Sequence, residues 1–436
     1  MGAVFRPALI LLAACLLLSY SLQVVTPLRL NGDAIALLGM AVSASDGQGF
    51  PNTRFPIGYP VLVVGLEKFG LATSTGLVAV NLLAMAAALA GYYWIFGRRL
   101  PLSQRAAATI CILSAGSWVL IKYATLPITD LVFFGVSAMV VVLATFAELS
   151  SGPKKIVALS GAAVLCMVAI SVRTIGIALV PALLWAAAGR EFAVALRRRT
   201  VLAGWGMVVA VVVLSIGYYG IAGTRYFHQL ISAAHGQSAG AMLAQNVGWR
   251  LQELGEIVMN APAARVPSSL RVAFPLAGAM ALLLYLIGLW SRRRSIGSLE
   301  VFLIGYSAIL LVWPYYGTRF WLPVIPPFLA FAWLGSREII AKIRLPRTAT
   351  TAIFVAFFVV FLLLGATALV YSTRISLAGK EFPERYGNGT LTETYRAALS
   401  QAHDPKRVDQ RALRLLERYD VRLSRKGEQR SHRDLY

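Results

Sequence analysis

Long apolar segments separated by short polar ones recur along the 436 residues of the chain. A helix needs about 20 predominantly apolar residues to cross the hydrocarbon core of a bilayer. Eleven segments approach that length, and we predict membrane-spanning helices near residues 7–25, 76–97, 106–122, 130–149, 155–171, 174–189, 201–222, 272–290, 299–314, 320–336 and 350–371. The pattern therefore predicts an all-α polytopic membrane protein with about eleven transmembrane helices.

Two shorter apolar patterns predict helices at the membrane surface. The run 57–66 is interrupted by Pro60 and closed by Glu67 and Lys68, so we expect a helix that lies at the interface or dips partly into the bilayer. In the long loop 223–271, apolar residues recur at the helical spacing that is typical of an amphipathic helix on a membrane. They are Leu243, Val247, Leu251, Leu254 and Val258.

The segment after residue 371 is rich in charge. A helical stripe within it predicts one short amphipathic helix. The stripe is formed by Val408, Ala412, Leu415, Leu416 and Tyr419. We therefore divide the chain into a transmembrane domain, 1–371, and a short charged C-terminal region, 372–436.

Composition and charge support a membrane assignment. The chain is 58% hydrophobic and 14% charged, whereas a soluble domain carries about 25% charged residues. The net charge of +22 would suit a nucleic-acid partner, but the basic residues gather between predicted spans, as in Arg98–Arg99, Arg197–Arg199 and Arg292–Arg294. If the N-terminus is cytoplasmic, every tight basic cluster falls on the inner side, as the positive-inside rule requires. We interpret the clusters as orientation signals and contacts to anionic lipid, and predict no nucleic-acid partner.

The same topology and an alanine- and arginine-rich composition predict a multi-pass protein of a bacterial plasma (inner) membrane, with its N-terminus in the cytoplasm and its C-terminal tail outside. The sequence contains no nucleotide-binding fingerprint, no HExxH and no GxSxG. Its four histidines are too sparse for a histidine metal cage, and its three cysteines lie inside apolar runs. Carboxylates, arginines and aromatic residues are therefore the groups left for chemistry on the outer face.

Two aspartates occupy positions suited to catalysis. Asp33 follows the first span in LRLNGDAIALLGMA, and Asp130 begins the fourth in ATLPITDLVFFGVSAM. An ionised carboxylate near a bilayer is costly unless it has a partner or a task, so both are candidate catalytic residues. The alternatives stay open that Asp33 only turns the chain and that Asp130 only caps a helix. Asp46, Glu67 and Glu253 are expected at the solvated surface.

Three arginines at the predicted outer ends of spans favour a phosphate site. Arg54 precedes the FPIGYP run that contains Tyr59, Arg173 lies in AISVRTIGIALVP, and Arg319 follows Tyr316 in WPYYGTRFWLPVIPP. An arginine stays charged and clamps phosphate oxygens bidentately. These five residues are therefore predicted to bind substrate, the alternative being an interfacial belt of aromatic and basic anchors.

Five of these segments, in order along residues 1–336, resemble the C-type glycosyltransferase superfamily. The likeness is strongest to the membrane family that includes the aminoarabinose transferases and the protein O-mannosyltransferases. It is carried by the first outer loop with Asp33, by RFPIGYPVLVVGLEKFG, LPITDLVFFGVSAM, RTIGIALVPALLW and GTRFWLPVIPPFLAF. The first loop has one acidic residue where the family has a pair, and the tail is far smaller than the outer domain of the aminoarabinose transferases.

The resemblance implies an inverting transferase that moves a sugar from a polyprenyl-phosphate donor to a glycan, lipid or protein acceptor on the outer face. Asp33 would be the general base, and Arg54, Arg173 or Arg319 would stabilise the phosphate leaving group. Asp130 would orient the acceptor, hold a divalent cation (Mg²⁺ or Mn²⁺) together with Asp33, or only cap its helix. The alternative functions are a transporter or flippase of lipid-linked glycans and a non-catalytic membrane assembly subunit.

Overall fold

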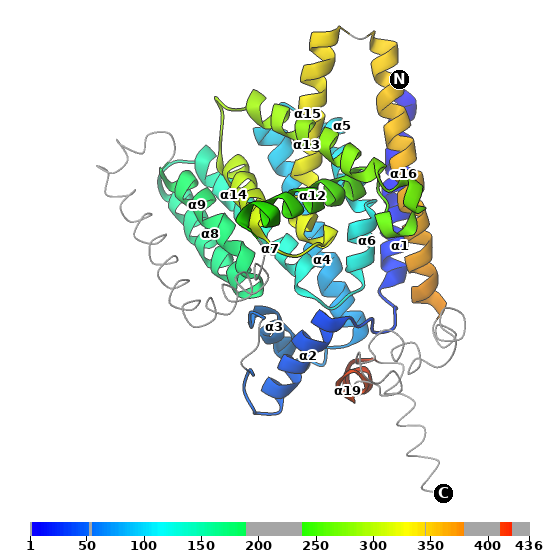
Figure 1. Ribbon diagram of the computed structural model, residues 1–436. Helices are drawn as coiled ribbons and strands as arrows, with labels where there is room; N and C mark the ends of the chain where they lie inside the picture. Colours follow the sequence, from blue (N-terminus) through cyan, green and yellow to red (C-terminus); the bar gives the residue numbers. More distant parts are fainter. Residues whose placement is uncertain (1, 52–54, 189–237, 345, 379–409, 421–436) are drawn as a thin grey trace, which may run out of the picture. The chain divides into compact units, whose positions relative to one another are not determined.

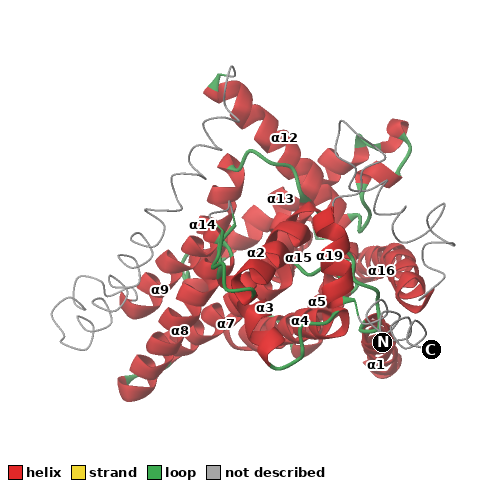
Figure 2. Cartoon of the chain, turned by 90° about the horizontal axis from the view of Figure 1, so that it is seen from below, coloured by secondary structure: helices red, strands yellow, loops and turns green. Residues whose placement is uncertain are grey.

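A computed structural model of the chain describes residues 2–51, 55–188, 238–344, 346–378 and 410–420. The α-helices among them are α1 (Gly2–Gln23), α2 (Gly32–Ser45), α3 (Gly58–Lys68), α4 (Ser74–Arg99), α5 (Gln104–Ala115), α6 (Trp118–Ala124), α7 (Thr129–Leu149), α8 (Gly152–Val172), α9 (Leu179–Ala188), α12 (Ala239–Val258), α13 (Ala273–Ser291), α14 (Ser298–Val312), α15 (Ile325–Ile343), α16 (Arg347–Ala378) and α19 (Gln410–Tyr419) (Figure 1). Short 3₁₀ helices are η1 (Thr174–Ala178), η3 (Ala263–Arg265), η4 (Ser268–Leu270) and η5 (Thr318–Val324). Over these ranges every regular element is a helix (Figure 2), which confirms the predicted all-α class.

Among the described residues, six helices are long and apolar enough to cross a membrane, and the bent pair α5–α6 makes a seventh if it is one span. Each predicted span within the described ranges coincides with a helix or with a 3₁₀ turn leading into one. The described residues also contain four shorter apolar helices: Leu9–Gln23, Gly32–Ser45, Thr174–Ala188 and Ser298–Val312. The predicted span 201–222 lies outside the described residues, and the total of eleven stays a prediction.

The predicted span 106–122 is broken between α5 and α6, which meet at an angle of 54°. The buried side chain of Asn260 fills the break. Its Nδ2 donates to the Gly116 carbonyl at 3.0 Å and to the Phe361 carbonyl at 2.7 Å, and its Oδ1 accepts from the Trp118 N–H at 2.7 Å. Backbone groups freed by a helix break must find other partners, and here one side chain supplies them.

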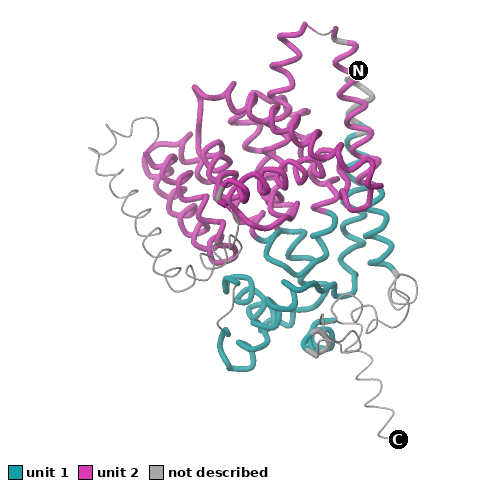
Figure 3. Tube along the Cα trace, viewed as in Figure 1, with its two compact units in different colours: residues 1–83, 121–132, 367–436 teal, residues 84–120, 133–366 magenta. Residues whose placement is uncertain are grey.

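The chain forms two compact units (Figure 3). Unit 1 comprises residues 1–83, 121–132 and 367–436, and unit 2 comprises residues 84–120 and 133–366. Unit 1 thus draws on both ends of the sequence. The division at residue 371 into a transmembrane domain and a tail stays a prediction.

In unit 1, helix α2 packs against α3 and α19. The tail helix confirms the predicted amphipathic segment, because Leu415, Leu416 and Tyr419 are buried. The predicted surface helix at 57–66 is α3, which continues to Lys68.

Close backbone packing organises unit 2, where α13 lies between α12 and α15. A Cβ atom added at Gly278 would lie 1.8 Å from the Leu251 carbonyl oxygen on α12. One added at Gly288 would lie 2.0 Å from the Phe331 carbonyl oxygen on α15. Only glycine permits such an approach, as in other membrane helix pairs.

Two of the predicted basic clusters also contribute to the packing of unit 2. Arg99 forms an ion pair with Glu148 at 3.5 Å, and Arg292 forms one with Glu300 at 3.6 Å. The Arg292 guanidinium also donates to the Arg99 carbonyl at 2.9 Å. The clusters therefore also have a structural role. Arg99 joins the end of α4 to the end of α7, and Arg292 joins the end of α4 to the first turn of α14.

Candidate functional site

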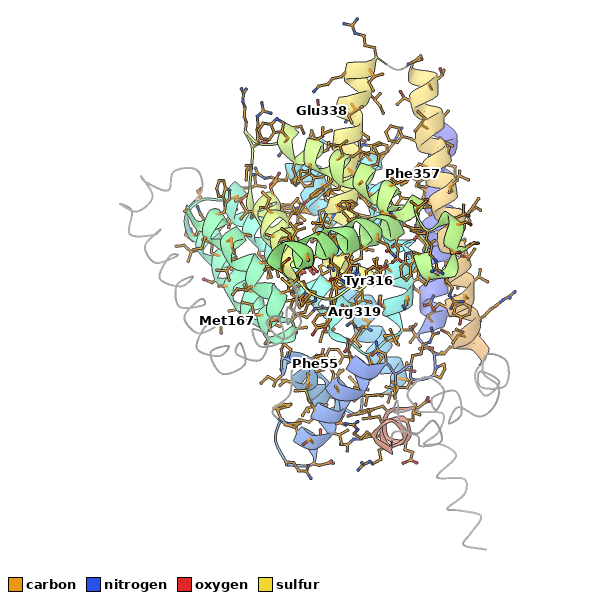
Figure 4. All side chains as sticks on the ribbon, viewed as in Figure 1. Phe55, Met167, Tyr316, Arg319, Glu338 and Phe357 are labelled. Atoms are coloured by element: carbon orange, nitrogen blue, oxygen red, sulfur yellow. The ribbon has the colours of Figure 1, made fainter. Side chains whose placement is uncertain are left out.

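The most constrained polar segment of unit 2 joins α14 to α15 and contains Arg319. Tyr306 donates its hydroxyl to the Phe320 carbonyl at 2.6 Å, and Tyr92 donates to the Pro323 carbonyl at 2.9 Å. The segment therefore folds into the 3₁₀ helix η5, and not into the first turns of the single span predicted at 320–336. Figure 4 shows Tyr316 and Arg319 close together on this segment.

Helix α12 binds the same segment from its side through two buried carboxylates. Glu253 accepts from the Gly317 N–H at 2.6 Å and from the Trp321 indole N–H at 2.8 Å. Glu256 accepts from the Tyr316 hydroxyl at 2.7 Å and from the Thr318 hydroxyl. Hydrogen bonds to both sides of Arg319 therefore fix the backbone on which it stands.

Arg250 completes this network, which we call the α12 carboxylate shelf (Arg250, Glu253 and Glu256). Its guanidinium lies 3.1 Å from Glu253 and donates to the Tyr315 carbonyl at 2.6 Å. Burial raises the pKa of the Glu253 carboxyl above its ordinary value, and Arg250 with the two N–H donors opposes that rise. A buried charge is tolerated when it is paired and hydrogen-bonded in this way.

The expectation for Glu253 was wrong, because this residue is fully buried and not at the surface. The predicted helix is α12, and its apolar stripe is divided: Leu243 and Val247 are exposed, Leu254 is buried, and Asn246 is buried with the shelf. In a membrane an apolar exposed face contacts lipid, so polar residues are the ones turned toward protein. The spacing 246, 250, 253, 256 is itself helical, and this second stripe was the available signal.

The structure brings together two of the three predicted phosphate-binding arginines. Arg173 lies at the junction of α8 and η1, where the backbone is extended. Its guanidinium carbon is 5.6 Å from the centre of the Phe320 ring, and that of Arg319 is 5.3 Å from the same ring. Both cations therefore share one buried aromatic ring, each in the range of a cation–π contact.

This arrangement suits an anion. A phosphate within reach of both guanidinium groups would accept charge-assisted hydrogen bonds from them. Both side chains are half-buried, so they are accessible to a ligand. We call Arg173, Phe320 and Arg319 the arginine pair site.

Tyr316, which was predicted to bind substrate, uses its hydroxyl to bind the shelf. It donates to Glu256 and accepts from Gln252 at 3.3 Å. Its side chain remains exposed, so its ring is available to a ligand. Its role in substrate binding stays a prediction.

The predicted catalytic aspartates lie in unit 1, each in the first turn of a helix. Asp33 is half-buried at the start of α2, and Asn31, not Asp33, provides the cap by accepting from the Ala34 N–H at 2.8 Å. Asp130 is 2% exposed, one residue past the start of α7. The positive end of a helix dipole favours a carboxylate in both positions.

Tyr59, also predicted to bind substrate, is buried on α3. Its hydroxyl is enclosed and has no hydrogen-bond partner within the part of the chain that the structure describes. Arg54 lies outside the described residues. The substrate-binding role of both residues stays a prediction.

A divalent cation held by Asp33 and Asp130 needs further ligands, since Mg²⁺ prefers six oxygen atoms. Over the described ranges, no three His, Cys, Asp or Glu side chains gather so that they could hold a metal ion. A cation held by Asp33 and Asp130 would therefore need its remaining ligands from water or substrate oxygens, and it stays a prediction.

No protein-family model matches the chain, and no curated protein matches it in sequence. Its fold, however, is similar to solved structures. ArnT from Cupriavidus metallidurans bound to undecaprenyl phosphate matches with a TM-score of 0.51 and 14% identity, over 97% of this chain and 86% of that one. The apo state of the same protein matches with a TM-score of 0.51 and 15% identity, over 96% and 86%.

The archaeal oligosaccharyltransferase AglB from Archaeoglobus fulgidus, in complex with an inhibitory peptide and a dolichol-phosphate, matches with a TM-score of 0.43 and 12% identity, over 84% of this chain and 55% of that one. A likeness at that level supports no conclusion about this chain. The similarity to ArnT, an aminoarabinose transferase, spans nearly the whole sequence. The chain therefore has the C-type glycosyltransferase-like membrane fold that its ordered segments resemble.

Proposed function

We propose that this protein is an inverting glycosyltransferase that moves a sugar from a polyprenyl-phosphate donor to an acceptor on the outer face of a bacterial plasma membrane. The observation that carries the proposal is the arginine pair site. Two guanidinium groups from distant segments lie over Phe320, and the α12 carboxylate shelf accepts hydrogen bonds from residues on both sides of Arg319. A pair of cations suits a leaving group whose negative charge grows during the reaction.

The fold supports the same class of donor. A structural neighbour, ArnT, was solved with undecaprenyl phosphate bound, and the present chain follows that fold over almost its full length. A sugar that must react outside the cell, where nucleotide donors are absent, has to arrive on a carrier that crosses the membrane. A lipid phosphate meets both requirements.

In the proposed reaction, an acceptor hydroxyl attacks the anomeric carbon of the sugar. A new carbon–oxygen bond forms on one face while the bond to the phosphate oxygen breaks on the other, so the configuration inverts. Asp33 takes the hydroxyl proton, and the electron pair of the broken bond leaves on the polyprenyl phosphate. Arg173 and Arg319 stabilise that leaving group.

Binding of undecaprenyl phosphate to the purified protein in nanodiscs tests the phosphate assignment. We expect Arg319→Ala and Arg173→Ala each to weaken binding by about 10-fold or more, the scale of one lost charge-assisted hydrogen bond. Arg319→Lys keeps the charge but loses the bidentate fork, so it should fall between wild type and Arg319→Ala. Arg265→Ala is the matched control, because Arg265 is an exposed arginine on η3.

Equal binding by wild type and Arg319→Ala would reduce this arginine to a membrane anchor. Release of free polyprenyl phosphate from a panel of lipid-linked sugars would support transfer. Movement of the intact lipid-linked sugar across a vesicle membrane without such release would favour the transporter instead.

A further inference from the structure

Within unit 1, the C-terminal helix α19 packs on α2, the helix that carries Asp33, and hydrogen bonds reach the residue that caps α2 and the link that precedes it. At the C-terminal end, Arg418 donates to Asp46 at 3.0 Å and to Glu67 at 2.9 Å. Before the N-terminal end, the N–H of Leu28 donates to the Asp420 carboxylate at 3.1 Å. Arg418, in the last turn of α19, and Asp420, just after it, therefore bind the C-cap of α2 and the link that leads into its first turn.

The charges at these contacts explain why the helix docks there. Asp46 is the C-cap of α2, and Glu67 lies in the last turn of α3. A carboxylate at the C-terminal end of a helix is disfavoured by the dipole, and here two such carboxylates lie close enough to share one guanidinium. Arg418 offsets both, because its planar fork presents donors in two directions.

Burial adds to the charge pairing. The Asp420 carboxylate is 2% exposed, and Leu415, Leu416 and Tyr419 of α19 are buried as well. An ionised side chain is stable in such a place only with partners, and the Leu28 N–H is one of them. The docked helix is therefore held by an apolar face and by polar contacts at its C-terminal end.

The segment between α1 and α2 is fixed from a second side. The Arg29 guanidinium donates to the Ser372 carbonyl at 3.0 Å and to the Ser376 hydroxyl at 2.9 Å, both on α16. Leu28 is bound to Asp420 and Arg29 is bound to α16, so the backbone that leads into α2 is held by two separate contacts. The position of Asp33, at that start, depends on these contacts.

We propose that Arg418 and Asp420 are positioning residues for the reaction of Asp33, and that α19 is a clamp on the helix that carries the base. The proposal rests on the proposed function, since it assigns these residues to the transfer step. Their effect is to hold the C-cap of α2 and the link before its first turn, so that the carboxylate of Asp33 meets the acceptor hydroxyl at a productive distance.

Two measurements on the full-length protein test the clamp. The first is amide hydrogen exchange of peptides covering residues 24–31 and 42–50, which reports docking without any need for activity. The second is the rate of sugar transfer, separated into kcat and the KM for the donor. The variants are Arg418→Ala, Arg418→Lys and Asp420→Ala, with Arg414→Ala as the matched control because Arg414 is exposed on the same helix.

We expect faster exchange in residues 42–50 for Arg418→Ala, and in residues 24–31 for Asp420→Ala. A misplacement of about 1 Å can cost up to about 10²-fold in rate, so kcat should fall about 10-fold or more. The KM for the donor should change little, because the arginine pair site belongs to other elements. Arg418→Lys should recover part of the loss, and Arg414→Ala should match wild type.

Unchanged exchange in both Arg418→Ala and Asp420→Ala would overturn the clamp. Faster exchange with an unchanged kcat would overturn the positioning role while leaving a structural contact. A wild-type protein that transfers no sugar from any polyprenyl-phosphate donor would overturn the proposed function instead, and the exchange data would still decide whether α19 is docked.

Discussion

The two aspartates differ in burial although each lies in the first turn of a helix. Asp33 is half-buried, and its helix is capped by Asn31. Asp130 is almost fully enclosed. A general base must reach a proton on a substrate, so partial exposure favours Asp33 for that role. Burial suits Asp130 for a role in holding structure or in orienting a bound acceptor.

Asp33→Asn is therefore expected to lower sugar transfer by about 10²-fold or more, the usual scale for a positioned general base. Asparagine is nearly isosteric and is well tolerated at a helix N-terminus, so folding and donor binding should change little. Turnover of the purified variant with a lipid-linked sugar gives the measurement, and undecaprenyl phosphate binding serves as the control for folding.

Turnover within a few-fold of wild type would remove Asp33 from the catalytic step. An equal loss in Asp130→Asn, with a requirement for added Mg²⁺ or Mn²⁺, would favour a cation between the two carboxylates, completed by substrate or water oxygens.

At the scale of elements, the segment with η5 depends on α12 for its shape. It is short, contains Pro323, and buries most of its side chains. The shelf accepts hydrogen bonds from Gly317, Thr318 and Trp321, on both sides of Arg319. A substitution in the α12 carboxylate shelf should therefore alter the position of Arg319, although no shelf residue belongs to the arginine pair site.

Glu253→Ala should destabilise the protein by about 3 kcal/mol or more, because it leaves Arg250 buried without its partner and two N–H groups without an acceptor. A lower thermal unfolding midpoint in detergent is the expected result. The same variant should weaken undecaprenyl phosphate binding, because Arg319 loses its support.

Glu338→Ala is the control for that experiment, since Glu338 is an exposed glutamate on α15 (Figure 4). If both variants unfolded at the wild-type midpoint, the hydrogen bonds of Glu253 would contribute nothing measurable to stability.

Hydropathy predicts these helices well and their irregularities poorly. The spans near 130–149 and 155–171 agree with α7 and α8 to within a few residues, because lipid demands a continuous apolar run. The break at Gly116 and the turn of η5 were not predicted. Both depend on polar side chains far away in the sequence, Asn260 for the break and Glu253 and Glu256 for η5, and a hydropathy average over neighbouring residues contains no information about them.

Whole-molecule contacts were the least accessible to sequence reasoning. The arginine pair site was partly foreseen, because arginines at span ends are visible in the sequence. The contact between Leu28 and Asp420 joins residues 392 positions apart, and no local pattern encodes it. The expectation that Asp46 lies at the solvated surface is confirmed, because the residue is exposed, but no local pattern predicted its ion pair with Arg418.

Because α19 packs on α2, the tail helix and the first loop must lie on the same side of the membrane. In a cysteine-free background, a cysteine at position 414 should react with a membrane-impermeant reagent in intact cells, and one at 293 should not. Both positions are exposed arginines in the wild type, so access is comparable. Labelling of 293 alone would reverse the predicted orientation, and labelling of both would contradict the predicted topology of eleven spans.

Unit 1 is built from segments that are far apart in the sequence, so its parts are synthesised at different times. Residues 1–83 are synthesised before unit 2, whereas α19, which docks on α2, is synthesised after it. Until then Asp46 and Glu67 lack Arg418, and α19 does not yet hold the helix that bears Asp33. A chain interrupted before residue 410 would still insert most of its spans, but it would carry an unclamped base. Competence for transfer would thus be conferred only once α19 has been made.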